Sequence, residues 1–306
     1  MSFLSILLAL LIEQARPLKP VNMVHGRSRD WVLWVTRHLD TGEGRHAWIT
    51  WTAAVVLPAA LSALVHWALW LSVGWMLALV WNVLVLYWTL GFRQFSHHFT
   101  EIRDALEAGD EELARKLLAQ WMRIDASDLP RSEIVRQVLA HSVLSAHRRV
   151  FGVFAWYSVL SAFGLGPAGA VIYRLAEYFS VVVLRPVKAP SLLMSHALKA
   201  AVMQGWSLID WVPSRITALG FAFVGSFEEA IDRWRKYEQA KPGDNNGILL
   251  AATAGALNVQ LATDDLQGAA PQAQIEHLRA LVGLVWRTVV MWMVILALLS
   301  LARLLG

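Results

Sequence analysis

An acid, a proline and an arginine interrupt an apolar run that extends from residue 200 to residue 224. They are Asp210, Pro213 and Arg215, in the sequence Asp-Trp-Val-Pro-Ser-Arg. Ionisable side chains in hydrocarbon are costly and usually face a partner or a water-filled cavity. Proline removes one helical hydrogen bond and bends or breaks a helix. We therefore predict a broken or re-entrant segment over residues 200–224 that is non-helical or sharply kinked around Pro213. Asp210 or Arg215 is expected to bind polar groups at the cytoplasmic boundary.

Two interpretations of these charged residues stay open. In the first, Arg215 anchors an anion and Asp210 orients the arginine, since hydrogen bonds between ionised groups are strong and directional. In the second, the two residues form a structural pair or a local cap that pins a broken segment. Mutation alone does not separate the two, because loss of folding imitates loss of function.

Two groups of basic and histidine side chains flank the polar middle of the chain. The first group is Arg93, His97 and His98, and the second is His141, His147, Arg148 and Arg149. Because histidine titrates near neutrality, the two groups together would form a basic pocket for a phosphate or a carboxylate. The alternative is ordinary snorkelling at a membrane interface. We predict no metal site, because neighbouring histidines on a helix face different directions and no i, i+4 pair is present.

The composition places the chain in the membrane class. Of its 306 residues, 57% are hydrophobic and 16% are charged, whereas soluble domains have roughly 45–50% apolar and about 25% charged residues. Sixteen tryptophans agree with this class, since amphipathic rings gather where lipid headgroups meet hydrocarbon. The absence of cysteine excludes disulfides and thiolate metal sites. A net charge of +4 without a basic run makes nucleic acid an unexpected partner.

Apolar blocks long enough to cross a bilayer predict two helical hairpins and a final span. These blocks are residues 48–71 and 73–91, residues 150–165 and 168–184, and residues 281–302. Basic residues precede the first hairpin, separate the two hairpins and follow the second, so the positive-inside rule makes these segments cytoplasmic. Residues 2–12 are too short to span, and we expect a short anchor packed on the bundle. A cleaved signal peptide is the rival interpretation.

The segment between the hairpins predicts a helical cap. Asp110 is placed to cap a helix whose apolar stripe runs from Leu113 to Trp121, and a second helix is expected from Ser132 onward. The cap either packs on the bundle or closes its polar edge over a substrate. Further along, residues 228–247 are polar and end in residue types that are common in turns. The small residues at 254–256 permit the close approach of another helix. Residues 263–274 are expected to form a surface loop.

The expected fold class is therefore all-α: a polytopic helical membrane protein with about five spans, broken or re-entrant helices and a cytoplasmic helical cap. We place it in a bacterial inner membrane. The expected division is an anchor, loop and first hairpin (1–91), the cap (92–149), the second hairpin (150–184), broken segments and polar loops (185–280) and the last helix (281–306).

Three short motifs resemble the CobD/CbiB family of membrane proteins, in that family's order. They are Gly-Asp-Glu-Glu-Leu-Ala-Arg at 109–115, the run at 210–215 followed by Ile-Thr-Ala, and Asn246-Gly247 leading into Ala-Gly-Ala-Leu at 254–257. The resemblance implies a role in cobalamin biosynthesis, as an ATP-dependent ligase that joins an aminopropanol-type side chain to cobyric acid, with ATP and Mg²⁺ as cofactors. Residues 210–234 also resemble the AmpE branch, which implies a regulatory membrane protein without turnover.

The chain departs from the enzyme branch of that family in two segments. That branch carries a Glu-Asn pair and then an Asp before its third membrane segment, where this chain reads residues 141–149 without a carboxylate. It carries Asn-Thr-Leu-Asp-Ser near residues 173–178, where Glu177 is the acid of this chain. The resemblance thus adds Glu177 and Asn246 to the candidate ligand-binding residues. If the missing acids bind Mg²⁺ or phosphate, the chain is a divergent member with weak or no catalysis.

The expected partners follow from these alternatives. They are the lipid bilayer, a corrinoid or a phosphorylated small molecule, a regulatory protein, and a second copy of the chain.

Overall fold

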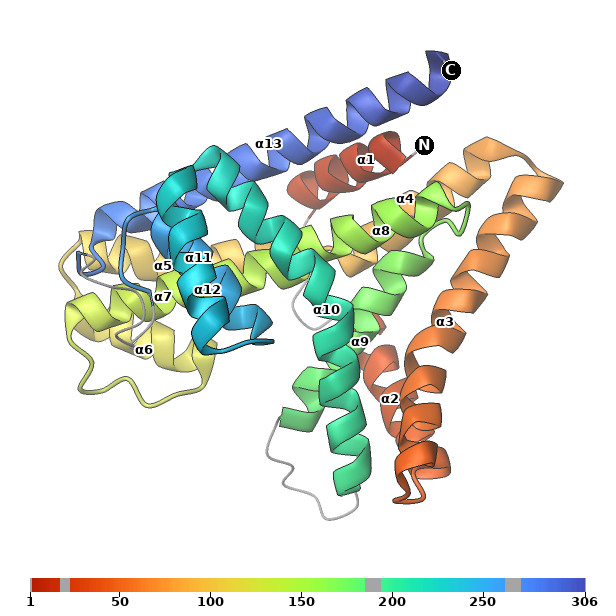
Figure 1. The fold of residues 1–306 in the computed structure, drawn as a ribbon, viewed down its shortest axis with the longest axis horizontal. Coiled ribbons are helices and arrows are strands. Elements are labelled where there is room, and N and C mark those ends of the chain that lie inside the picture. Colours follow the sequence, from red (N-terminus) through yellow and green to blue (C-terminus); the bar gives the residue numbers. More distant parts are fainter. Residues whose placement is uncertain (1, 17–22, 185–193, 262–270, 306) are drawn as a thin grey trace. The chain divides into compact units, whose positions relative to one another are not determined.

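The structure is a computed structural model that describes residues 2–16, 23–184, 194–261 and 271–305 (Figure 1). Within these ranges the regular structure is helical and no strand occurs, which confirms the all-α class. The chain forms two compact units. Unit 1 comprises Met1–Gly91 and Arg148–Pro213, and unit 2 comprises Phe92–His147 and Ser214–Gly306. Each unit therefore contains segments that are far apart in the sequence.

Unit 1 contains both predicted hairpins. Its helices are α1 (Ser2–Ala15), α2 (Met23–Leu39), α3 (Gly44–Ser72), α4 (Trp75–Thr89), the π-helix η1 (His147–Phe151) from Arg148 on, α8 (Gly152–Ala162), α9 (Ala168–Leu184) and α10 (His196–Val224) up to Pro213. The turn between α3 and α4 holds Gly74 at φ +104°, and the turn between α8 and α9 holds Gly166 at φ +54°. Glycine adopts positive φ without a steric penalty. Both pairs of helices thus form hairpins as predicted, and their crossing of the membrane stays a prediction.

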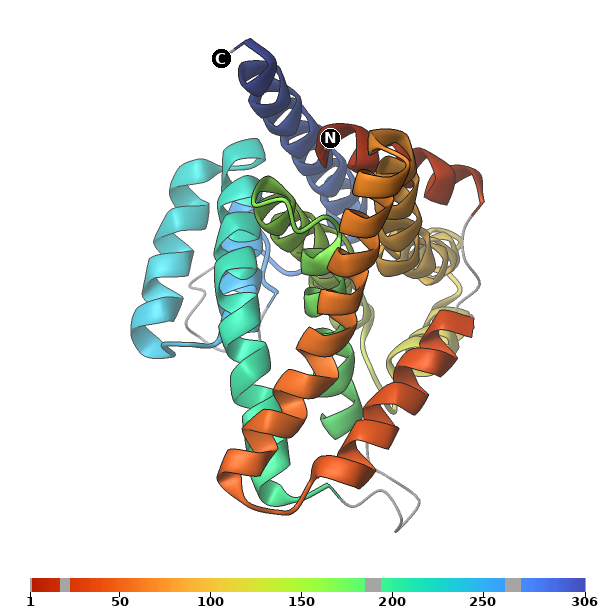
Figure 2. The same cartoon turned by 90° about the vertical axis from the view of Figure 1, so that its right-hand side faces the viewer.

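The first hairpin is extended at its other end by α2, which packs along α3 (Figure 2). α1 packs against α4 and α8, as expected for a short anchor. Within the described ranges, two helices are long and apolar enough to cross a membrane, over Gly44–Ser72 and Ile275–Arg303, and α1 and α4 are shorter apolar helices. α8 has 11 residues and α9 has 17, below the ~20 of a straight span. Helix length thus supports two of the five expected spans.

Glycines set the close packing of α8 against α9. A Cβ atom at Gly152 would lie 2.0 Å from Cζ of Tyr173, and one at Gly169 would lie 2.0 Å from the carbonyl oxygen of Trp156. Only a residue without a side chain fits at such positions, as at the interfaces of membrane helices generally. These two contacts fix the register between α8 and α9 and place Tyr173 inside unit 1.

α10 is one continuous helix of 29 residues with Pro213 inside it, so the prediction of a non-helical break over 200–224 is wrong. The alternative, a sharp kink at Pro213, stays a prediction. Proline takes the amide donor away from the carbonyl four residues earlier, which here is that of Ile209. The indole Nε1–H of Trp156 donates to that carbonyl oxygen at 2.9 Å. The unpaired acceptor is satisfied from α8, and the helix does not have to unwind.

The same arrangement occurs in α3. Pro58 lies inside this helix and frees the carbonyl of Ala54. The indole Nε1–H of Trp31, from α2, donates to the Ala54 carbonyl oxygen at 2.9 Å. In both α3 and α10, a tryptophan of a neighbouring helix in the same unit thus donates the hydrogen bond that the internal proline cannot supply.

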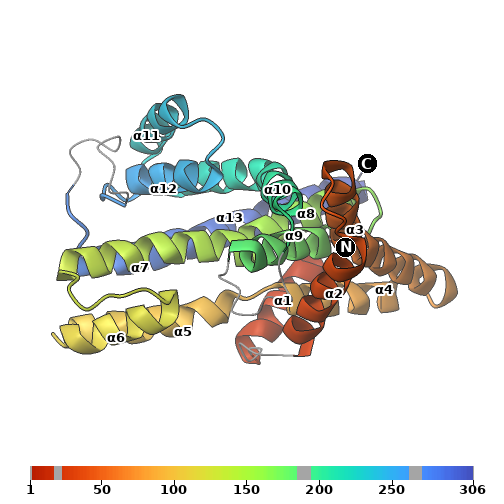
Figure 3. The same ribbon diagram turned by 90° about the horizontal axis from the view of Figure 1, so that it is seen from below.

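Unit 2 contains the predicted cap. Its helices are α5 (Phe92–Glu107), α6 (Glu111–Met122), α7 (Arg131–Ala146), α10 from Ser214 on, α11 (Phe227–Ala240), α12 (Asn245–Ala256) and α13 (Ile275–Leu305). α5, α6 and α7 pack together, and α13 packs along α7 (Figure 3).

The local predictions for the cap are largely confirmed. Oδ1 of Asp110 accepts a hydrogen bond from the amide of Leu113 at 2.9 Å and so caps α6. Along α7, Ile134 and Val138 are buried. The predicted stripe of α6 needs one correction, because Leu113 is 44% exposed while Ala114 is buried. The buried face of α6 therefore begins one residue later than the pattern indicated.

α11 and α12 form a tight helical hairpin (Figure 3). A Cβ atom at Gly255 would lie 2.4 Å from the carbonyl oxygen of Glu229, which confirms the predicted close approach. The turn holds Gly243 at φ +86°. Most of the polar stretch before it, however, is the helix α11, because its apolar side chains recur on one face and pack on α12. The loop predicted over 263–274 lies mainly outside the described residues.

Candidate functional site

A buried cluster of charged and aromatic side chains lies in unit 1. The hydroxyl of Tyr173 donates to Oδ1 of Asp210 at 2.8 Å, and both residues are at most 1% exposed. The ring of Trp206 lies 5.3 Å from that of Tyr173. The guanidinium carbon of Arg148 lies 5.9 Å from the centroid of the Trp206 ring, within the range of a cation–π interaction. α9, α10 and η1 thus bring these side chains together.

The charges of this cluster extend along α9. Nη1 of Arg174 binds a carboxylate oxygen of Glu177 at 2.9 Å. Arg149 interacts electrostatically with Arg174, with Glu177 and with Glu13 of α1. Tyr173 in turn lies within the electrostatic range of Arg148 and Glu177. We call this set the Tyr173 cluster: Glu13, Arg148, Arg149, Tyr173, Arg174, Glu177, Trp206 and Asp210.

The Tyr173 cluster combines three guanidinium groups with three carboxylates. Buried charges are stable only when they are paired and hydrogen-bonded. Glu177 pairs with Arg174, and Asp210 accepts a hydrogen bond from Tyr173. The guanidinium groups of this cluster are of the kind that binds carboxylates and phosphates through paired hydrogen bonds.

A second polar network lies in unit 2 and contains Arg215. Its Nη2 binds a carboxylate oxygen of Glu238 at 2.7 Å, and its Nη1 binds Oδ1 of Asn245 at 3.1 Å. Trp234 donates its indole N–H to the same carboxylate of Glu238 at 2.9 Å. Asn246, a predicted ligand-binding residue, is next to Asn245 in the first turn of α12. The prediction that Asp210 or Arg215 binds polar groups is confirmed for both, and each has partners in its own unit.

Asp244 forms two further hydrogen bonds in the same part of unit 2. Its Oδ1 accepts from the amide of Gly247 at 3.0 Å and caps α12, while its Oδ2 accepts from the hydroxyl of Tyr237 at 2.7 Å. Gly247 lies directly on the Tyr237 ring, where a Cβ atom would be 2.1 Å away. This hairpin holds Asn245 and Asn246 rigidly beside α10.

The predicted histidines gather in unit 2. The rings of His98 and His141 lie 5.9 Å and 4.5 Å from the ring of Trp121. His97 and His98 both reach Glu101, at 3.6 Å and 3.5 Å, so these neighbouring side chains converge on one carboxylate rather than diverge.

His147 is buried, and its Nδ1 forms a hydrogen bond of 2.9 Å with Oγ1 of Thr217. Arg93 lies at the start of α5, and its side chain is outside the described part of the structure. Among the residues that the structure describes, no group of three or more His, Asp or Glu side chains is placed to hold a metal ion.

The sequence interpretation missed several buried polar residues of unit 1. His66 of α3, Asn82 of α4 and Tyr157 of α8 are at most 8% exposed. Asn82 lies close to both His66 and Tyr157. A polar residue inside an apolar span usually faces the bundle interior or marks a functional position. That signal was present in the spans at 48–71 and 73–91, and it would have identified His66 and Asn82.

Comparisons with known proteins find one matching family model and several relatives. A family model described as CobD/Cbib protein matches residues 3–182. A "Cobalamin biosynthesis protein CobD" from Stutzerimonas stutzeri is 28% identical over 325 aligned residues, which cover 96% of each chain. Proteins with the same name from Chromobacterium violaceum and Leptospira interrogans are 27% and 29% identical; the matches cover 68% and 61% of this chain, and 63% and 58% of theirs.

No solved structure matches the chain.

Proposed function

The chain belongs to the CobD/CbiB family, and from this premise we propose that it acts in cobalamin biosynthesis as an integral membrane protein. The relative that aligns along almost the whole chain carries that role in its name. The helical architecture with apolar helices supports a membrane location.

We propose that the Tyr173 cluster is where this chain binds an anionic precursor, a corrinoid or a phosphorylated amine. The observation that carries the proposal is the meeting of two segments in unit 1. Arg148 and Arg149 come from the first segment in which the chain departs from the enzyme branch, and Tyr173 and Glu177 come from the second. Electrostatic interactions link them. Guanidinium groups bind carboxylates and phosphates through paired hydrogen bonds.

ATP and Mg²⁺ fit this cluster poorly. Mg²⁺ prefers carboxylate oxygens and retains several waters, whereas Glu177 binds Arg174 and Asp210 accepts from Tyr173. Metal-bridged neutralisation of phosphate charge is central to phosphoryl activation. We therefore propose that the chain is a divergent member with weak or no ligase activity, and we assign no step to a bound metal.

The test combines binding with complementation. Purified protein is titrated with cobinamide, cobyric acid and ATP while the corrinoid absorption spectrum is recorded. We expect a spectral shift that Arg148→Gln weakens and that Lys116→Gln, on the exposed face of α6, leaves intact. In a strain without a functional cobinamide-phosphate synthase, we expect little or no rescue. Full rescue that depends on Asp210 and Arg215 would establish the ligase and overturn the proposal of weak catalysis.

The regulatory alternative has its own outcome in this experiment. If neither rescue nor corrinoid binding occurs, the AmpE-like interpretation becomes the better one. The exposed surface of the cap over residues 109–149 is then the first place to test for a protein partner.

We also propose a multi-pass arrangement in the bacterial inner membrane with residues 92–149 on the cytoplasmic side. The basic residues around both hairpins support this orientation under the positive-inside rule. Because the chain has no cysteine, single cysteines can be introduced and labelled with a membrane-impermeant maleimide. Ser72→Cys should react from outside intact cells, whereas Arg131→Cys should react only after permeabilisation. Labelling of Arg131→Cys in intact cells would reverse the orientation.

A further inference from the structure

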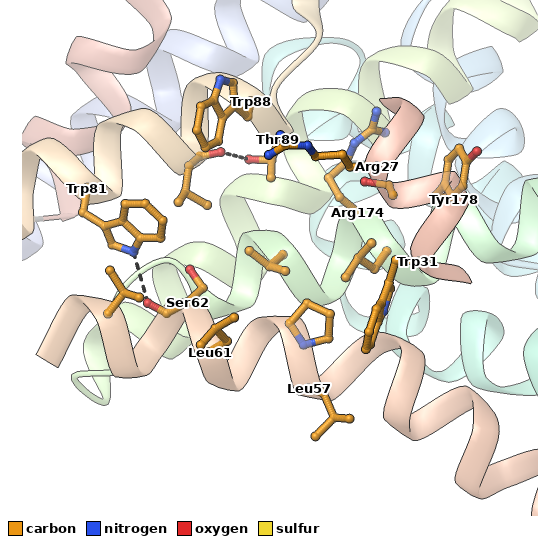
Figure 4. A pocket seen from close by; sticks show the side chains of 16 residues that line it. Arg27, Trp31, Leu57, Leu61, Ser62, Trp81, Trp88, Thr89, Arg174 and Tyr178 are labelled. Atoms are coloured by element: carbon orange, nitrogen blue, oxygen red, sulfur yellow. Dashed lines mark hydrogen bonds between the residues drawn. The ribbon is translucent and has the colours of Figure 1, made fainter. Parts of the chain in front are cut away.

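A partly open cleft of about 620 Å³ lies within unit 1 and is lined by α2, α3, α4 and α9 (Figure 4). Its volume is typical of sites that bind small organic ligands. The cleft shares Arg174 of α9 with the Tyr173 cluster, and its other lining residues lie outside that cluster. Its long wall is formed by α3, with Leu57 and Leu61, and α4 contributes Trp81 and Trp88.

Two indole N–H groups of the cleft wall are bound to the backbone. Trp31 Nε1–H donates to the Ala54 carbonyl oxygen at 2.9 Å, and Trp81 Nε1–H donates to the Ser62 carbonyl oxygen at 3.1 Å. These two indoles therefore present ring surface to the cleft and keep no N–H for a ligand. Together with the leucines of α3 they give this part of the cleft a mainly apolar wall.

The cleft has a cationic end. In Figure 4, Arg27 and Arg174 lie at the end where Tyr178 is found, and Trp81 lies at the opposite, apolar end. Arg174 is ion-paired with Glu177 at 2.9 Å. Arg27 is exposed and forms no ion pair with any residue that the structure describes. One uncompensated guanidinium therefore stands at the end of an apolar cleft.

The membrane supplies a matching ligand. α3 has the length and hydropathy of a bilayer span, and it contributes the cleft residues from Leu57 to Val65. A half-open apolar surface at bilayer depth is in contact with acyl chains, and phosphate is the group that arginine binds best in a bidentate manner. We propose that this cleft binds an anionic phospholipid, with one acyl chain along Leu61 and Trp81 and the phosphate on Arg27.

Native mass spectrometry of the full-length protein in detergent tests this proposal. The protein is titrated with phosphatidylglycerol, with phosphatidylcholine of the same acyl chains, and with inorganic phosphate. We expect wild-type protein to bind phosphatidylglycerol several-fold more tightly than phosphatidylcholine. Both lipids present a phosphate to Arg27, but the trimethylammonium group of phosphatidylcholine cancels the net charge of its headgroup and weakens its attraction to the arginine. Equal affinity for the two lipids would overturn the proposal, and so would tighter binding of inorganic phosphate than of phosphatidylglycerol.

Two matched pairs of variants locate the site. Arg27→Gln should remove the preference for phosphatidylglycerol, whereas Arg29→Gln, an exposed arginine on the same helix outside the cleft, should keep it. Leu61→Trp should fill the cleft and weaken the binding of both lipids. Leu64 is a similarly exposed leucine of α3 outside the cleft, so Leu64→Trp should leave the binding of both lipids unchanged.

Thermal unfolding of each variant checks that it is folded. All four substituted residues are exposed, so we expect unfolding transitions like that of the wild type. If Arg27→Gln and Arg29→Gln reduce the affinity for phosphatidylglycerol equally, or if Leu61→Trp retains full lipid binding, the cleft is not the lipid site.

Discussion

Replacing Trp156 with phenylalanine removes the indole N–H that binds the Ile209 carbonyl, and we expect this change to destabilise unit 1 measurably. Pro213 cannot supply an amide to that carbonyl. The hydrogen bond from Trp156 is 2.9 Å long and partly buried. Without it, an acceptor inside an apolar bundle is left unsatisfied.

The expected loss of stability on replacing Trp156 follows from this geometry. Leaving a buried acceptor unpaired costs about 1–3 kcal/mol in folded proteins, and interhelical hydrogen bonds in membrane proteins average about 0.6 kcal/mol with a maximum near 1.7. We expect a loss of about 1–2 kcal/mol for Trp156→Phe from the hydrogen bond. The smaller ring adds a packing loss, so the single variant does not isolate the hydrogen bond.

A double-mutant cycle with Pro213→Ala isolates it. Alanine at this position restores an amide that donates to the Ile209 carbonyl, so the indole becomes dispensable. We expect Trp156→Phe to cost about 1 kcal/mol less in the Pro213→Ala background than in the wild type. The measurement is the free energy of unfolding in mixed detergent micelles with increasing dodecyl sulfate, followed by far-ultraviolet circular dichroism.

Two further cycles serve as controls. Trp31→Phe with Pro58→Ala should show coupling of the same sign, because Trp31 completes α3 in the same way. The crossed cycle of Trp156→Phe with Pro58→Ala should be additive, because these residues share no partner. If the matched cycles are additive within about 0.3–0.5 kcal/mol, the indoles do not compensate for the prolines and our explanation of the continuous helices is refuted.

Three other predictions use the same unfolding measurement. Gly152→Ala puts a methyl group where Tyr173 lies, and overpacking should cost about 1–3 kcal/mol. Arg215→Lys keeps the charge but loses the fork that binds a carboxylate and an amide, at a cost of about 1–2 kcal/mol. The hydrogen bond from Arg136 lowers the pKa of Glu133 below 4.5, so its stabilising effect is complete above about pH 4.5 and is lost as the pH falls through the lower folded-state pKa. Glu133→Gln should therefore lose less stability than the wild type on acidification.

Each of these predictions has a matched control. Gly283→Ala adds a methyl group where no atom lies within 4 Å and should be neutral or slightly stabilising. Arg235→Lys and Glu112→Gln change exposed residues of α11 and α6 and should have little effect. A Gly152→Ala protein as stable as the wild type would contradict the close packing of α8 on α9. Parallel acid profiles for Glu133→Gln and the wild type would contradict the role of Arg136.

Much of the local structure could be predicted from the sequence. Runs of apolar residues marked both hairpins, and glycines marked their turns, because backbone φ and one-sided burial depend on a few neighbouring residues. The cap of α6 by Asp110 followed from the same local rules. Charged residues in apolar runs also identified Asp210 and Arg215 as residues with polar partners.

The candidate site was predictable only in part. Asp210, Glu177 and Arg148 were recognised as individual residues, and the structure brings them into one cluster. Tyr173, the residue that donates to Asp210 from 37 positions away, was not recognised as a site residue. A tyrosine in a largely apolar helix, such as Tyr173 in α9, carries no local signal of the carboxylate that it will meet.

The continuity of α10 was decided by tertiary structure alone. Pro213 read by itself predicts a break, because the amide that it lacks normally closes the helical turn. The break is avoided by Trp156, which lies 53 positions away and reaches Ile209 from α8. Helix periodicity fixes what residues can do within four positions of each other. Which distant donor meets which unpaired carbonyl depends on how the helices pack, and the contact of Trp156 with Ile209 exists only once α8 and α10 lie together.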